Sequence, residues 1–226
     1  MSERKMEPYL MSVLSSRLYS IGLEMTNTMI RAARSSVMSI SRDLSTAICD
    51  RHGNVIAISH GIPVHCANMG LTVKPCFEHP EGIHPGDLFL NNSPYYGNTH
   101  HADYTFIAPV FYGDELMFFA VAKGHQADCG NTIPSTYHAT AKDKFEEGAI
   151  DWPCIKIQKD YTDVPDIIAI AKANLRIPDI WYGDYLAGVG AARTGENRLK
   201  ELYEEYGTET IKCFCDEFRN TGREKS

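Results

Sequence analysis

Residues 103–128 read DYTFIAPVFYGDELMFFAVAKGHQAD, and this stretch decides the fold. The runs from Tyr104 to Phe111 and from Glu115 to Ala122 are rich in aromatic and aliphatic residues. Tyr112, Gly113 and Asp114 between them form a turn signal. Two such runs around a short Gly-containing turn predict an antiparallel β-hairpin.

Other strands are expected on the N-terminal side of this hairpin. Residues 45–59 contain two β-rich runs, STAICD and NVIAIS, around a turn at residues 50–53, and predict a second hairpin. A short strand is expected at residues 88–90, after the turn formed by His84-Pro85-Gly86-Asp87. Residues 124–148 are polar, rich in Gly and Pro, and expected to form an irregular functional loop.

Helical spacing of apolar residues dominates both ends of the chain. It predicts one long helix from Tyr9 to about Ser36 and a short helix from Ala67 to Phe77. Further helices are expected at residues 164–176, 179–206 and 208–218. The predicted fold class is therefore α+β, with a long N-terminal helix, central β-hairpins and a helical C-terminal part. We divide it into an α+β region at residues 1–160 and a helical region at residues 161–226, packed as one structural unit.

The composition is that of an ordinary globular protein of one domain, with or without a small extension. The chain has 226 residues, of which 43% are hydrophobic and 23% charged, and a formal net charge of −7. A mildly acidic net charge does not indicate a basic surface that would attract nucleic acid or an anionic membrane. No apolar run approaches the roughly 18 residues of a membrane span, and the first ten residues have no secretory signal. Seven scattered cysteines without a CxxC pair indicate free thiols in a reducing cytoplasm.

Histidine and aspartate flank the central hairpin on both sides. Thr99-His100-His101-Ala102-Asp103 leads into its first strand, and Gly124-His125-Gln126-Ala127-Asp128 follows its second strand. Because paired strands lie roughly 5 Å apart, these flanks should meet at the open end of the hairpin. Two imidazoles and a carboxylate suit Zn, Mn or Fe and leave open positions for water or a small-molecule substrate.

The spacing alone leaves the choice of ligands open. His101 competes with His100, since adjacent side chains point in different directions and one of them should be a direct ligand. Asp128 could orient His125 through a hydrogen bond rather than bind the metal.

Asp43, His65 and Asp128 are the candidates for catalytic roles, with Cys129 as an alternative nucleophile. Asp43 precedes the expected strand of the second hairpin and is another acidic group for the site. His65 is either a group of the substrate pocket or a buried core histidine with satisfied hydrogen bonds. Cys129 has only its proximity to Asp128 to support a nucleophilic role.

Nucleotide-binding and serine-hydrolase motifs are missing from the chain. It has no Walker A loop and no GxSxG elbow, so no residue is assigned to binding a nucleotide cofactor. The lone Gly188-Val189-Gly190 lies within helical sequence, where a helix-packing role is the better interpretation.

Several segments resemble the hydantoinase B/oxoprolinase family in order and spacing across nearly the whole chain. Ile62–His65 is similar to the family's IPVH segment, Pro85–Tyr95 to its PGDxFLxNDPY segment and Gly97–Asp103 to its GxTHxxD segment. His125–Asp128 is similar to HxAD, and Phe145–Gly148 is similar to QEG. Asn174–Arg176 is similar to NxRxP, and Ala192–Glu196 is similar to NRTGE. The family includes the B-type subunits of N-methylhydantoinase and of acetone and acetophenone carboxylases.

The resemblance implies a particular set of ligands. In the family, the His and Asp of THxxD and the His of HxAD hold a metal, which implies His100, Asp103 and His125 here. The family's Arg-x-Asp-Phe-Ser segment corresponds to Arg42-Asp43-Leu44-Ser45, which implies that Asp43 joins or flanks the metal.

The resemblance also implies a division of labour between subunits. An A-type subunit uses ATP and Mg²⁺ to phosphorylate the substrate, and the B-type metal site then hydrolyses a cyclic amide or carboxylates a ketone. The chain therefore resembles the metal-bearing subunit of an ATP-dependent hydrolase or carboxylase. The alternatives are a ketone carboxylase subunit specifically, a non-catalytic structural subunit, and a free-standing metallohydrolase.

Two departures from the family pattern stand out. The NDP of the family reads Asn92-Ser93-Pro94 here, so one carboxylate near the loop is missing. The family's B-type chains are also much longer, and the likeness covers their N-terminal part. A natural split, a truncation and a decayed homologue remain open, and in each case a further chain should complete the B-type subunit.

Overall fold

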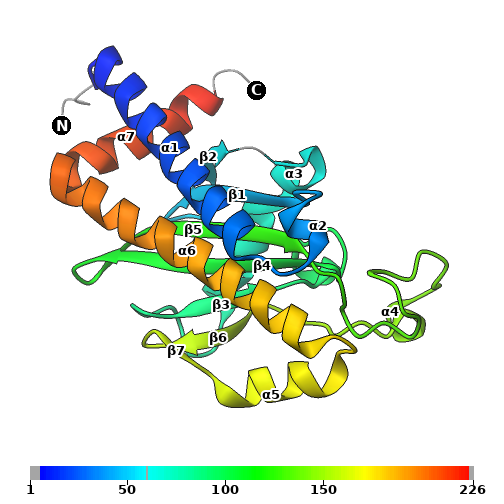
Figure 1. Ribbon diagram of the computed structural model, residues 1–226. Helices are drawn as coiled ribbons and strands as arrows, with labels where there is room; N and C mark the ends of the chain where they lie inside the picture. The colour runs from blue at the N-terminus through cyan, green and yellow to red at the C-terminus, as the bar shows by residue number, and fades with distance from the viewer. Residues whose placement is uncertain (1–5, 60, 224–226) are drawn as a thin grey trace.

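The computed structural model describes residues 6–59 and 61–223, and its centre is one antiparallel β-sheet. The seven strands follow the order β2-β1-β5-β4-β3-β6-β7 (Figure 1). Their bounds are β1 (Leu44–Asp50), β2 (Val55–Ser59), β3 (Leu88–Asn91), β4 (Asp103–Tyr112), β5 (Glu115–His125), β6 (Ile155–Lys159) and β7 (Thr162–Asp163). The expected hairpins are thus neighbouring parts of a single sheet.

The central hairpin is confirmed and is longer than the sequence predicts. Strand β4 begins at Asp103 and β5 ends at His125, so both flanking residues belong to the ladder itself. Asp103 pairs with His125, and the pairing runs to Tyr112 opposite Glu115. The second hairpin, β1 and β2, is also confirmed, and it joins the first through β1 against β5.

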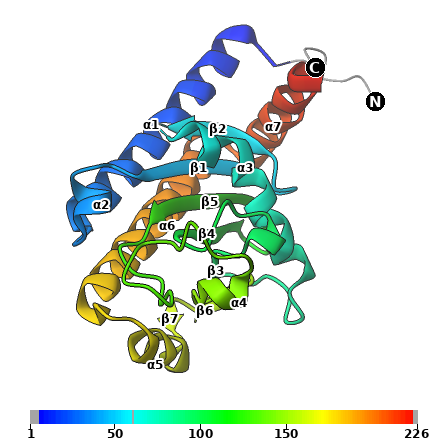
Figure 2. The same cartoon turned by 90° about the vertical axis from the view of Figure 1, so that its right-hand side faces the viewer.

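Helices cover the two faces of the sheet unequally. Helices α1 (Pro8–Ala32) and α6 (Pro178–Tyr206) lie along one face, while α3 (Pro63–Val73) lies on the other (Figures 1 and 2). The remaining helices are α2 (Ser36–Ser39), α4 (Lys144–Glu147), α5 (Pro165–Asn174) and α7 (Thr208–Arg223), with 3-10 turns η1 (Lys74–Glu78) and η2 (Pro94–Tyr96). The α+β fold class with its long N-terminal helix is confirmed.

The core has a large and a small part, separated by the sheet. On the α1 and α6 face, Leu14, Met25 and Leu199 pack against strand residues such as Phe106 and Ala120. On the α3 face a smaller cluster consists of Met69 and Val73 from the helix and residues such as Cys49 and Val121 from the strands. The polar end of this second face holds the candidate site.

The first helix ends earlier than the expected boundary at Ser36. Helix α1 stops at Ala32, and the backbone N–H groups of Arg34 and Ser35 donate to the Asp184 carboxylate at 2.7 and 3.0 Å. Asp184 comes from α6, so a long-range contact turns the chain into the short helix α2. Periodicity in the sequence cannot report this contact.

Two strands at the far edge of the sheet were not predicted. Strands β6 and β7 have 5 and 2 residues and pair with each other around Asp160 and Tyr161, which both adopt positive φ. Segments this short carry little periodic signal, so β6 is assigned by its pairing with β3, and β7 by its pairing with β6, rather than by their sequence.

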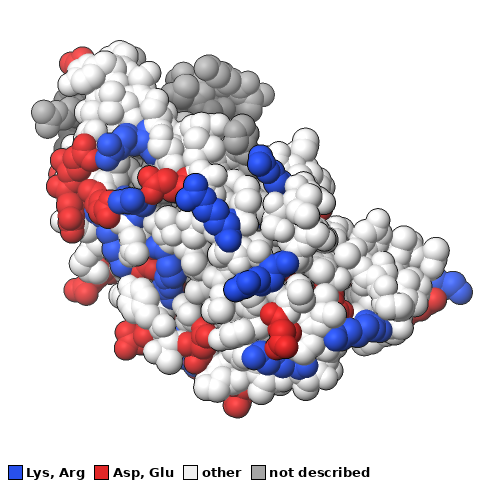
Figure 3. All heavy atoms as spheres, in the orientation of Figure 1, with Lys and Arg blue, Asp and Glu red and all other residues white. Residues whose placement is uncertain are grey.

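Acidic and basic side chains are interspersed on the face covered by α1 and α6 (Figure 3). Some of them join the two helices, as in the ion pairs of Arg17 with Glu205 at 2.5 Å and of Arg198 with Glu24 at 2.7 Å. No helix among residues 6–59 and 61–223 is both long and apolar enough to cross a bilayer.

Candidate metal centre

Two polar rows lie across the strands at the end of the α3 face. In the outer row Asp103 of β4 is directly opposite His125 of β5, whose backbone N–H donates to the Asp43 carbonyl at 3.0 Å. In the next row Lys123 of β5 is opposite both Thr105 and Ser45. Because side chains alternate along a strand, residues 123 and 125 of β5 share one face of the sheet.

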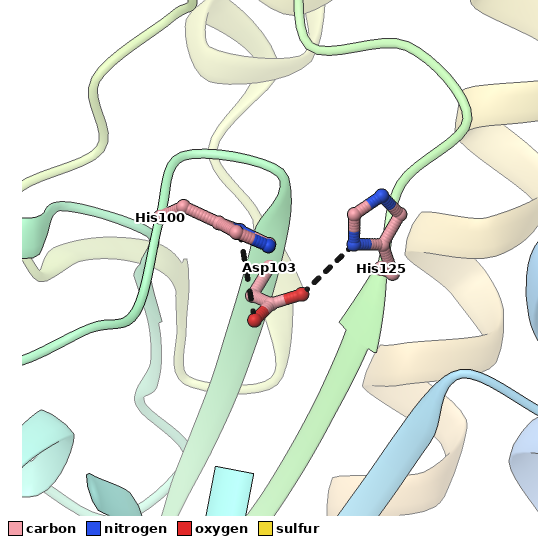
Figure 4. A group of neighbouring side chains, drawn as sticks. All are labelled: His100, Asp103 and His125. Carbon is pink, nitrogen blue, oxygen red and sulfur yellow. Dashed lines mark hydrogen bonds and ion pairs between the residues drawn. The ribbon is translucent and has the colours of Figure 1, made fainter. Parts of the chain in front are cut away.

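The structure brings His100, Asp103 and His125 together, each contributing one ligand atom within 4.8 Å of the others. Asp103 Oδ1 lies 3.1 Å from His125 Nδ1, and Asp103 Oδ2 lies 3.6 Å from His100 Nδ1 (Figure 4). The two imidazole rings meet edge to face with centroids 5.2 Å apart. His100 reaches the cluster from the loop before β4, whereas His125 ends β5 (Figure 4).

Asp103 is the shared centre of the cluster and is held as a carboxylate. Burial by itself raises the pKa of Asp103, but hydrogen bonds from His125 and His65 and the charge of His100 hold it well below its usual value. The Thr99 hydroxyl also donates to Oδ2. A buried carboxylate with a low pKa is ready to bind a cation.

A second group of three, Asp43, His65 and Asp103, shares the central carboxylate. His65 is buried on α3, with Nε2 3.0 Å from Asp103 Oδ2 and Nδ1 3.0 Å from the Ser45 hydroxyl. Both of its ring nitrogens therefore have partners within the protein. His65 orients Asp103 in this structure, a contact that sequence reasoning did not find.

Asp43 stands at the open side of the cluster. Its carboxylate oxygens lie 3.9 Å from His65 Nε2 and 3.9 Å from His125 Nδ1. The side chains of Asp43 and His100 are 32% and 42% exposed, whereas that of Asp103 is 1% exposed. The cluster is therefore accessible from the side of Asp43 and His100.

The Asp128 carboxylate hydrogen-bonds to backbone groups rather than to the His125 ring, the partner that the sequence offered as one alternative. Asp128 Oδ2 accepts hydrogen bonds from the backbone N–H groups of Arg176 and Ile177, at 2.5 and 3.2 Å. Its Oδ1 accepts from Gly130 N–H at 3.0 Å. Asp128 thus fastens the loop after β5 to the junction of α5 and α6, and Asp103 orients His125 instead.

His101 points away from the cluster, which leaves His100 as the histidine of this loop that faces Asp103. His101 is buried, and its Nδ1 lies 2.7 Å from Glu147 Oε2. It thereby connects the loop before β4 with α4.

Aromatic and thiol side chains near the cluster have distinct roles. The Tyr137 ring stacks on His100 with centroids 5.8 Å apart, whereas Tyr104 is fully buried and accepts a hydrogen bond from Trp152. Cys129 is buried, and burial raises the pKa of its thiol far above its usual value. A thiol held neutral in this way is a poor nucleophile.

Lys123 is the member of the site region that sequence reasoning missed. It is fully buried, and burial lowers its pKa to about 8, although the charge of Asp103 acts in the opposite direction. The signal was present: Lys123 is the one charged residue in the strand run MFFAVAK, two positions before His125.

The residues fit a divalent cation. His100 Nδ1 and Asp43 Oδ1 are buried atoms without a hydrogen-bond partner, and both belong to groups that could hold a metal. Buried polar atoms without a hydrogen-bond partner are rare in folded proteins, because burying them is energetically unfavourable. A bound ligand that interacts with such atoms removes this unfavourable free energy. Imidazole nitrogens with carboxylate oxygens form the donor set of Zn, Mn or Fe sites.

Comparison with known proteins gives consistent matches over the chain. The family model described as hydantoinase B/oxoprolinase matches residues 7–226. The B-type subunit of a putative D-/L-hydantoinase from Pseudomonas sp. strain NS671 is 31% identical over 96% of this chain and 38% of the relative. The beta chain of the caprolactamase from Pseudomonas jessenii is 32% identical over 95% of this chain and 37% of the relative.

Solved structures show the same fold. The ATP-dependent caprolactamase of Pseudomonas jessenii superposes with a TM-score of 0.87 and 30% identity, covering 96% of this chain and 37% of that chain. A nucleotide-free acetone carboxylase superposes with a TM-score of 0.85 and 24% identity, covering 92% of this chain and 28% of that chain. The chain thus spans well under half the length of these relatives.

Proposed function

The chain belongs to the hydantoinase B/oxoprolinase family, and from this premise we propose that it is the metal-binding catalytic part of an ATP-dependent enzyme that opens a cyclic amide. The observation that carries the proposal is the convergence of His100, Asp103 and His125, with a buried His100 Nδ1 that has no hydrogen-bond partner. Asp43 and His65 border the same carboxylate.

Cyclic amides are the substrate class that the relatives favour. Hydantoin, caprolactam and 5-oxoproline, after which relatives are named, are all cyclic amides. The likeness to acetone carboxylase, at 24% identity, speaks for the fold alone. Carboxylation of a ketone is therefore the alternative that the assay below must exclude.

The cation, Zn, Mn or Fe, would be held by His100, Asp103 and His125. When bound, it would supply a Lewis acid that polarises a carbonyl or phosphoryl oxygen of the substrate. His65 fixes the Asp103 carboxylate through Nε2 and is itself held by Ser45 through Nδ1. The Asp43 carboxylate, whose side chain is 32% exposed and whose Oδ1 has no hydrogen-bond partner, is the group that we assign to accept a proton from the reacting groups.

A partner supplies the activation step in this proposal. The chain has no phosphate-binding loop, so an A-type subunit would use ATP and Mg²⁺ to phosphorylate the substrate. Because these 226 residues span 38% and 37% of two relatives, we also propose that residues outside them complete the substrate cleft. Regions 1–160 and 161–226 would act as one unit in that assembly.

Metal analysis tests the site directly. We expect purified protein to hold about one divalent ion per chain, and His100→Ala to hold almost none. His101→Ala is the matched control, because it removes the neighbouring histidine that points to Glu147. Equal and negligible metal in wild type and His100→Ala would overturn the catalytic proposal and favour a structural subunit.

The substrate class needs the whole complex. ATP hydrolysis should be measured with cyclic amides and with ketones, in the presence and absence of bicarbonate. We expect ATP hydrolysis coupled to ring opening of a cyclic amide, without any need for bicarbonate. Bicarbonate-dependent product from a ketone would establish a carboxylase instead, and an isolated active chain without ATP would establish a free-standing hydrolase.

A further inference from the structure

Lys123 forms a buried polar contact directly beneath the candidate metal centre. Its side chain points to the α3 face of the sheet from the row next to His125 and Asp103. The ammonium group donates to Asn98 Oδ1 at 2.6 Å and to Asn68 Oδ1 at 2.9 Å. Burying an ammonium group without such acceptors would be very unfavourable, so these contacts are needed for the fold to tolerate it.

Asn98 connects this ammonium group to the loop that carries His100 and leads into β4 at Asp103. The Asn98 amide nitrogen donates to the backbone carbonyls of Asp103, at 2.5 Å, and His100, at 3.5 Å. One side chain thus contacts the backbone of both candidate ligands while its oxygen is held by Lys123. A shift of Asn98 would therefore move the loop relative to β5.

Asn68 connects the same ammonium group to helix α3. It lies three residues after His65, one turn along the helix. His65 in turn contacts Asp103 Oδ2 at 3.0 Å. The three elements that form the cluster, namely the loop before β4, helix α3 and strand β5, therefore meet at one nitrogen atom.

We propose that Lys123 is the positioning residue of the metal centre, fixing the loop of His100, where it enters β4 at Asp103, and the helix of His65 against strand β5. The effect on metal binding rests on the proposed function above. Lys123 is fully buried and acts through Asn98 and Asn68 rather than on the substrate.

The first experiment measures metal affinity and coordination. Lys123→Met keeps the length of the side chain and removes the donors, and we expect it to weaken Mn²⁺ binding about 10- to 100-fold, as loss of an outer-sphere contact does. The electron paramagnetic resonance spectrum of bound Mn²⁺ should change as well. Lys156→Met is the matched control: Lys156 is also buried, but its partner is Asp87 at 2.8 Å and it lies on β6.

A double-mutant cycle identifies the route of the effect. If Lys123 acts through Asn98, Lys123→Met and Asn98→Ala should each weaken Mn²⁺ binding, and the double variant should be little weaker than the worse single variant. Additive losses would overturn the proposed route. Lys123→Gln, which is polar but uncharged and too short to reach both acceptors, is the second variant for the case that Lys123→Met does not fold.

Amide hydrogen exchange gives a readout that needs no metal. In metal-free protein, Lys123→Met or Lys123→Gln should speed exchange across residues 98–103, whereas Lys156→Met should not. Unchanged exchange and unchanged Mn²⁺ binding would overturn the inference. If the wild-type protein binds no metal but the Lys123 variants still exchange faster than wild type across residues 98–103, the proposed function is contradicted and the loop-positioning role of Lys123 stands.

Discussion

Asp103 and His125 occupy directly opposite positions in the central hairpin, and their side chains lie 3.1 Å apart between Oδ1 and Nδ1. The residues are 22 positions apart in the sequence, and the antiparallel pairing of β4 with β5 closes that distance. The same pairing fixes the orientation of the His125 ring. Asp103 can therefore act both as a ligand and as the group that positions its neighbours.

Replacement of His65 should distinguish a positioning residue from a ligand. Both His65 nitrogens already contact Ser45 and Asp103, so we expect His65→Ala to weaken Zn²⁺ binding about 10- to 100-fold without abolishing it. His100→Ala should abolish binding in the same chelator-competition titration. If the two results were reversed, the ligand set would be Asp43, His65 and Asp103 instead.

Replacement of Asp128 should affect stability rather than metal binding. Asp128→Asn turns one acceptor oxygen into a donor that faces backbone N–H groups of residues 130, 176 or 177. We expect the free energy of unfolding in urea to fall by about 1–3 kcal/mol. The metal content, measured well below the melting temperature, should stay at the wild-type value, and its loss would return Asp128 to the metal centre.

Two glycines of helix α6 should respond in opposite ways to replacement by alanine. A Cβ at Gly188 would overlap the Phe106 ring, whereas one at Gly190 would meet only Thr28 Cγ2 at 3.8 Å. We expect Gly188→Ala to destabilise by about 1–3 kcal/mol through overpacking. Gly190→Ala should stabilise by about 0.5–1 kcal/mol through helix propensity.

The free energies of unfolding of Gly188→Ala and Gly190→Ala, measured in parallel by thermal or urea denaturation, check this prediction. An equal change in both would mean that α6 does not pack on β4 through Gly188. The outcome also tests the interpretation of the lone GxG as a helix-packing feature.

Lys123 should give the protein an unusual gain in stability at alkaline pH. Burial lowers its folded pKa to about 8 from the ordinary 10.5, so between these values the unfolded chain binds more protons than the folded chain. The free energy of unfolding must then rise with pH across this window, by about 3 kcal/mol.

Urea unfolding should be measured for metal-free wild type and Lys123→Met at several pH values from 7 to 10.5. All other titrating groups are present in both proteins, so the difference between the two unfolding free energies isolates the contribution of Lys123. The difference in unfolding free energy should move in favour of wild type as the pH rises. A difference that stays constant with pH would show that Lys123 keeps its ordinary pKa in the fold.

The sequence by itself determined the central hairpin, the second hairpin and the main helices at the two ends of the chain. Aromatic and aliphatic runs around Tyr112, Gly113 and Asp114 have few structural solutions, and antiparallel pairing then forces the flanks to meet. The proximity of Asp103 and His125 follows from that local pattern. The choice of His100 over His101 came from the resemblance to the family's THxxD segment rather than from spacing.

Only the tertiary structure decided the surroundings of that pair. Because α3 packs across the sheet, His65 reaches Asp103 and Asn68 reaches Lys123, while the Asp128 carboxylate accepts hydrogen bonds from backbone N–H groups of residues 176 and 177. The role of Lys123 depends on its two amide acceptors, which come from the loop before β4 and from α3. These contacts join residues far apart in the chain, and their energy depends on burial and hydrogen bonding that local periodicity does not encode.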